Sequence, residues 1–84
     1  MKTNNKGYNG HKNYNRWNVS LWIGNDEGLY RMARSIIREC EGFGGKQAAA
    51  EAMMARLKED GITHTPDGAP YSVTTIKAAL VGLG

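Results

Sequence analysis

Glycine and proline interrupt this sequence at intervals, and the segments between them have the length and apolar spacing of short helices. The interruptions fall at Gly24, at residues 42–45, at Gly61 and at the two prolines within residues 63–71. Apolar residues that recur every three or four positions are typical of a helix that buries one face. We therefore expect an all-α fold, a small bundle of about four short helices joined by glycine and proline turns.

The first periodic segment, residues 14–23, contains both tryptophans of the chain. Trp17 and Leu21 are four positions apart, which predicts a short helix that Gly24 ends. Tryptophan, valine and isoleucine are also frequent in strands. An α+β fold with a short strand at residues 18–23 is therefore the alternative.

A second helix is predicted from Asp26 to about Cys40. We expect Asn25 to cap its first turn, because an asparagine side chain can accept a hydrogen bond from the free N–H groups there. Gly42 is placed to take the left-handed conformation at the end of this helix. Phe43 should then fold back onto the helix.

The third helix is expected at residues 46–60, where alanine and other good helix formers are dense. Gly61 should end it in the left-handed conformation, with Ile62 in contact with Leu57. Beyond the proline-containing connector, Ser72 is placed to cap the last helix.

Large aliphatic side chains are scarce, since Leu, Ile, Val and Phe make up only 14 of the 84 residues. A core of this size rarely supplies more than about 3–5 kcal/mol. A homodimer or a stabilising partner is therefore one expected arrangement. The predicted core consists of ten residues from all four helices: Trp17, Leu21, Trp22, Leu29, Ile36, Ile37, Met53, Leu57, Ile76 and Leu80.

The net charge of +3 is concentrated at the N-terminus. The first sixteen residues contain four basic residues and no acidic one: Lys2, Lys6, Lys12 and Arg16. Because a segment this polar buries too little apolar surface to offset its ordering entropy, we expect residues 1–11 to form a mobile basic arm and residues 12–84 a single small helical domain. The arm is either a solubilising tail or a segment that orders on an anionic partner.

Three arginines three and four positions apart, Arg31, Arg34 and Arg38, are predicted to form one stripe on the second helix. Guanidinium groups bind phosphates and carboxylates, so the stripe is a candidate partner-binding surface together with Lys12 and Arg16. The alternative is a solvated face that nearby glutamates partly neutralise.

The two tryptophans would point about 140° apart on a helix, so one can be buried while the other is exposed. A buried tryptophan fills the core, and an exposed one can stack on a base or enter a pocket of a partner. We include Trp22 among the candidate partner-binding residues.

Residues for catalysis or metal binding lack the required spacing. His11, Cys40 and His64 are far apart in sequence, and no nucleophile with an adjacent base is evident. We expect no enzyme activity, no metal and no cofactor. No apolar run approaches the roughly 18 residues of a membrane span, the polar N-terminus is no signal peptide, and a lone cysteine suits a reducing cytoplasm. We therefore expect a cytoplasmic protein with no membrane partner.

Residues 12–30 carry a dense set of matches to a known pattern: Asn13-Tyr14, Trp17-Asn18-Val19, Leu21-Trp22 and Asn25-Asp26-Glu27. The later turn Thr65-Pro66-Asp67-Gly68 matches as well. In these motifs the chain resembles a small family of functionally uncharacterised proteins carried by bacteriophages and related mobile elements. The resemblance implies a phage or prophage setting and brings no catalytic residues.

Two functions are consistent with these observations. The first is a non-catalytic, phage-encoded binding protein that inhibits or redirects a host protein or ribonucleoprotein complex, most concretely an anti-CRISPR or other anti-defence protein. The second is a small nucleic-acid-binding accessory protein that uses the basic arm and the arginine stripe.

Overall fold

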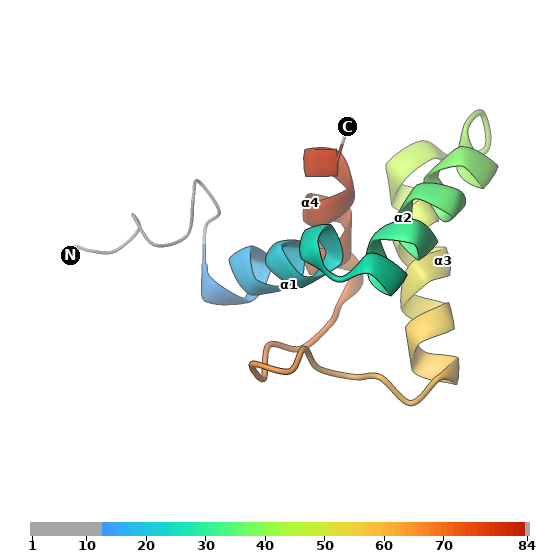
Figure 1. Cartoon of the computed structure of the whole chain (residues 1–84). Coiled ribbons are helices and arrows are strands. Elements are labelled where there is room, and N and C mark those ends of the chain that lie inside the picture. Colours follow the sequence, from blue (N-terminus) through green and yellow to red (C-terminus); the bar gives the residue numbers. More distant parts are fainter. Residues whose placement is uncertain (1–12, 84) are drawn as a thin grey trace.

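The computed structural model describes residues 13–83, which form four helices (Figure 1). In chain order these are α1 (Tyr14–Asn25), α2 (Glu27–Cys40), α3 (Gly45–Glu59) and α4 (Val73–Leu83). The expected all-α fold is confirmed, and the alternative strand at residues 18–23 is wrong because these residues lie inside α1. The predicted arm, residues 1–11, and Lys12 lie outside the described residues.

The helices pack in a closed ring. α1 packs on α2, α2 on α3, α3 on α4, and α4 returns to α1. Figure 1 shows the long connection from the end of α3 passing beside α1 before it reaches α4. This connection contains one isolated antiparallel bridge, between His64 and Pro70. The ring therefore places a loop from the C-terminal half against the first helix.

α1 and α2 meet without a linker. Gly24 does not end α1, because the helix continues to Asn25 and the N–H of Asp26 donates to the Trp22 carbonyl at 2.8 Å. Asp26 is then the N-cap of α2, since its carboxylate accepts from the N–H of Leu29 at 3.0 Å. The predicted cap, Asn25, is thus wrong by one residue. Gly24 has open space around it, and one glycine in an exposed helix costs only about 1 kcal/mol relative to alanine.

The end of α2 differs from the expected closure. Gly42 does take a positive φ of 83°. The preceding residue, Glu41, is already extended, however, and Phe43 is 79% exposed instead of folding back onto the helix. Because the chain leaves helical geometry before the glycine, the aromatic side chain is directed away from α2.

The end of α3 and the start of α4 follow the predicted rules. At the end of α3, the N–H of Ile62 donates to Leu57 at 2.9 Å and that of Gly61 to Lys58 at 3.0 Å, which is the hydrogen-bond pair of a Schellman motif. At the start of α4, the Ser72 hydroxyl accepts from the N–H of Thr75 at 3.1 Å. Both predictions are confirmed.

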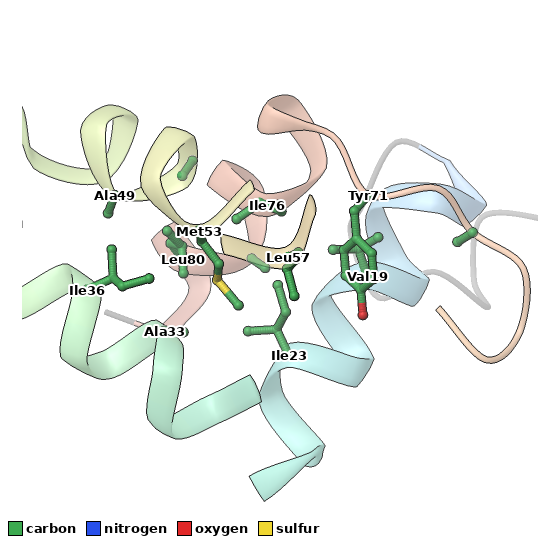
Figure 2. Packing of buried hydrophobic residues seen from close by; sticks show 13 residues of the cluster. Val19, Ile23, Ala33, Ile36, Ala49, Met53, Leu57, Tyr71, Ile76 and Leu80 are labelled. Atoms are coloured by element: carbon green, nitrogen blue, oxygen red, sulfur yellow. The ribbon is translucent and has the colours of Figure 1, made fainter. Parts of the chain in front are cut away.

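The core lies inside the ring of helices, and Figure 2 shows its labelled side chains converging from all four helices, with Tyr71 at one end. The prediction is confirmed for Ile36, Met53, Leu57, Ile76 and Leu80, which are buried. Leu29 and Ile37 are partly buried against this cluster. Small residues complete the core, which explains how a chain with few large aliphatics can fill it: Ala33, Ala49, Ala50, Ala69 and Ala79 are all buried.

The predicted buried face of α1 is wrong. Val19 and Ile23 are fully buried, whereas Leu21 is 37% exposed and Trp17 and Trp22 are only half-buried. The apolar residues of α1 surround the helix almost evenly, so their spacing alone could not select the face that packs against α4. That face also includes a polar residue, Asn18, which is 1% exposed.

Candidate functional site

A network of hydrogen bonds ties the loop at residues 65–69 to α1. Asp67 Oδ2 accepts from Asn18 Nδ2 and from the Trp22 indole Nε1, each at 2.9 Å. The Thr65 hydroxyl donates to Asn18 Oδ1 at 2.6 Å. We call these four residues, Asn18, Trp22, Thr65 and Asp67, the loop clamp. It satisfies a buried amide, which would otherwise cost about 1–3 kcal/mol if left without partners.

The loop itself is held in one conformation. Thr65 and Ala69 are joined twice, by the Thr65 N–H to the Ala69 carbonyl at 2.8 Å and by the Ala69 N–H to the Thr65 hydroxyl at 3.0 Å. Gly68 has a φ of 93°, a conformation that side-chain-bearing residues rarely adopt. The two motifs that carry the sequence resemblance are thus joined in the folded protein, because Thr65 and Asp67 of the TPDG turn bond to Asn18 and Trp22 of α1.

The clamp lowers the pKa of Asp67 below its ordinary value of 3.8. The hydrogen bond from Asn18 is the larger cause and that from Trp22 the smaller one, because both stabilise the ionised carboxylate. Asp67 is therefore a structural anion at neutral pH.

Beside the clamp lies a pocket of about 370 Å³, which we call the aromatic pocket. Its walls come from α1, the start of α2 and the α3–α4 connection, and consist of Trp22, Asp26, Leu29, Ile62, His64, Pro66 and Tyr71. Burial, and to a smaller extent the negative charge of Asp26, raise the pKa of Tyr71 above its ordinary value of 10.0. Tyr71 therefore keeps its proton at neutral pH.

A larger hollow of about 450 Å³, which we call the groove, runs along the outer side of α4. It is lined by Arg16 from α1, Gln47 from α3, and Val73, Thr74, Lys77, Ala78 and Val81 from α4. Within residues 13–83, the lining includes two cationic side chains and no acidic one, and Val81 is 59% exposed. Arg16 Nε is buried without a hydrogen-bond partner among the described residues. The groove thus combines positive charge with apolar surface.

The arginine stripe lies on α2, with all three side chains exposed. Arg31 forms an ion pair with Glu27 at 2.5 Å. The guanidinium carbon of Arg34 lies 5.9 Å from the centre of the Tyr30 ring. Its Nη1 atom donates to the Leu83 carbonyl at 3.5 Å. Most of the stripe is therefore engaged with neighbours inside the chain.

The five predicted partner-binding residues that the structure describes border four different hollows. Arg34 and Arg38 border a common small hollow with Ile37 and Glu41. Arg31 borders another, Arg16 lines the groove, and Trp22 belongs to the clamp and the aromatic pocket. Lys12 lies outside the described residues.

The interpretation of the sequence missed two features of the candidate site. One is the groove-facing side of α4, where Val73, Lys77 and Val81 recur every four positions. The sequence does contain a signal for this side of α4, because the helix has apolar residues on a second face besides the one that packs in the core. The other is Asp67, whose partners on α1 are 45 and 49 positions away and could not be found from local spacing.

The part of the chain that the structure describes contains no group of three or more His, Cys, Asp or Glu side chains able to hold a metal ion. Within the same residues, no helix is both long and apolar enough to cross a membrane.

Residues 4–82 match the profile of the Family of unknown function (DUF7249), and the chain belongs to this family. No curated protein and no solved structure matches the chain.

Proposed function

We propose that this member of the DUF7249 family is a binding protein that docks on an acidic surface of a host protein or ribonucleoprotein in the cytoplasm and inhibits or redirects it. The observation that carries the proposal is the groove, because its described lining presents two cations and an exposed aliphatic residue without an acidic side chain. Such a surface attracts carboxylates and also gains from the burial of apolar area.

The composition of the groove favours a protein partner over nucleic acid. Val73, Ala78 and Val81 contribute apolar surface between Arg16 and Lys77. A phosphate backbone has little apolar surface to bury against valine. An acidic protein segment with apolar residues can contact both the cations and the apolar side chains of the groove. The folded part from Trp17 onward also carries seven basic and eight acidic residues, which is not the strongly basic balance of a dedicated nucleic-acid-binding domain.

The setting of this function comes from the sequence resemblance to proteins of bacteriophages. In that setting, a small protein that occupies an acidic surface of a host complex acts as an inhibitor, and an anti-CRISPR or other anti-defence role is the concrete form that we propose. Binding alone is sufficient for this role, since blocking a surface requires no reaction.

The test is capture of partners from a bacterial host lysate by the tagged full-length protein, with and without nuclease. We expect one protein or complex to be retained after nuclease treatment. Lys77→Glu and Val81→Asp should each lower its retention about ten-fold, because each removes a central contact of the groove, and a ten-fold change corresponds to about 1.4 kcal/mol.

Lys58→Glu is the matched control, since Lys58 is exposed on α3 and does not line the groove. It makes the same change in net charge as Lys77→Glu and should leave retention unchanged. Equal losses in the two variants would show that overall charge, and not the groove, governs binding. Recovery of mixed nucleic acid that disappears with nuclease would support the accessory-protein alternative instead.

A further inference from the structure

The aromatic pocket has the opposite chemistry to the groove, and its contents are not explained by the proposed function. Its lining contains three rings, those of Trp22, His64 and Tyr71, and one carboxylate, that of Asp26. Among the described residues, no lysine or arginine lines it. Aromatic faces carry negative charge density, so rings together with a carboxylate favour a cation.

Asp26 retains binding capacity despite its role as the N-cap of α2. Its Oδ2 atom accepts from the N–H of Leu29, while Oδ1 has no hydrogen bond among residues 13–83. The side chain is exposed, and its charge contributes to the raised pKa of Tyr71, which also lines the pocket. A carboxylate oxygen is therefore present at the pocket, and no lysine or arginine among residues 13–83 lines the pocket to neutralise its charge.

Trp22 is fixed in position by the loop clamp. Its indole Nε1 donates to Asp67, whose second partner is the buried Asn18. A ring that is already held loses little conformational entropy when a ligand stacks on it. The hydrogen bond to a carboxylate also places negative charge at the edge of the indole, which further favours a cationic ligand.

We propose that the aromatic pocket binds the side chain of an arginine presented by a partner protein, with the guanidinium against Trp22 and paired with Asp26. Arginine fits better than lysine because its planar, weakly hydrated head stacks on aromatic rings and can also bind a carboxylate through two N–H groups. A volume of about 370 Å³ accommodates one long side chain together with part of its backbone. This site rests on residues distinct from those of the groove, so it does not depend on the proposed function.

The test uses NMR spectra of the ¹⁵N-labelled full-length protein titrated with the peptide acetyl-Gly-Gly-Arg-Gly-Gly-amide. We expect the Trp22 indole N–H signal to shift, with weak affinity because only one side chain is engaged. The same peptide with citrulline in place of arginine has nearly the same shape without the charge and should produce no comparable shift. Equal binding of the citrulline peptide would overturn the proposal, because it would show that the pocket selects apolar surface.

Asp26→Asn and Glu27→Gln form a matched pair of variants. Asparagine caps helices about as well as aspartate, so the first change removes the charge and keeps the start of α2. We expect it to weaken binding of the arginine peptide about five-fold, as for one partly exposed ion pair. Glu27 is adjacent, pairs with Arg31 and does not line the pocket, so Glu27→Gln should leave binding unchanged.

Equal effects of the two variants would contradict the proposal, since they would indicate general electrostatic attraction. Shifts of the Trp22 signal with protein concentration alone, without peptide, would assign the pocket to a second copy of the chain and would also overturn it. Retention of the host partner by Asp26→Asn separates this site from the groove, because the proposed function predicts no loss there.

Discussion

The groove and the loop clamp differ in how their polar groups are satisfied. In the clamp, the buried amide of Asn18 is bonded on both sides, to Thr65 and to Asp67, and Trp22 shares the same carboxylate. In the groove, Arg16 and Lys77 have no ion pair among the described residues, and Arg16 Nε is buried without an acceptor. Polar residues satisfied within the chain maintain the fold, whereas the exposed ammonium group of Lys77, which has no ion pair among residues 13–83, remains available for another molecule.

The largest effect expected from this difference is on stability. Asn18→Ala should lower the free energy of unfolding by about 2–3 kcal/mol, because it removes the acceptor of the buried Thr65 hydroxyl and one of the two donors to Asp67 and opens a small cavity. Lys77→Ala in the groove should change it by less than about 0.5 kcal/mol. Urea unfolding of the two variants and the original chain measures both values. Similar losses in the two variants would show that the groove is as structural as the clamp.

A moderate effect is expected at acid pH. Because the clamp lowers the pKa of Asp67 below 3.8, the unfolded chain takes up this proton first as the pH falls. The contribution of Asp67 to stability is therefore complete above about pH 5 and is lost as the pH falls through 3.8 toward the lower pKa of the folded state.

Melting temperatures recorded between about pH 6 and pH 2.5 measure this dependence. Asp67→Asn should make the decline at acid pH less steep, because the shifted carboxylate is gone. Lys77→Ala should leave the decline as it is in the original chain. A decline of the same steepness in Asp67→Asn would assign the acid sensitivity to other carboxylates.

The smallest effect is expected on the arginine stripe. The Arg31–Glu27 pair is 75–76% exposed, and exposed ion pairs contribute about 0–1 kcal/mol. Arg31→Ala should therefore change the free energy of unfolding by less than about 0.5 kcal/mol and should not alter retention of the host partner. Thermal unfolding measures the change in stability, and the capture assay measures retention of the host partner. A ten-fold loss of partner retention in Arg31→Ala would show that the partner binds the arginine stripe on α2 and not the groove.

Local sequence signals were sufficient for the four helices, for the end of α3 and for the start of α4. Alanine-rich composition predicts α3, and Gly61 ends it with the expected pair of hydrogen bonds. Ser72 caps α4 as predicted. These features depend on residues within one or two turns of each other, so the sequence contains all the information that they require. The one-residue error at Asp26 arose because one residue both follows α1 and caps α2.

The tertiary structure decided which face of α1 is buried and where the candidate binding surfaces lie. Apolar residues surround α1, so α2, α4 and the connecting loop select Val19 and Ile23 for the core and leave Leu21 exposed. Asn18 meets Asp67 across 49 positions, and the groove joins residues from three helices. The sequence by itself therefore determined the helices, because their signals are local, whereas the clamp, the aromatic pocket and the groove exist only once helix packing brings distant residues together.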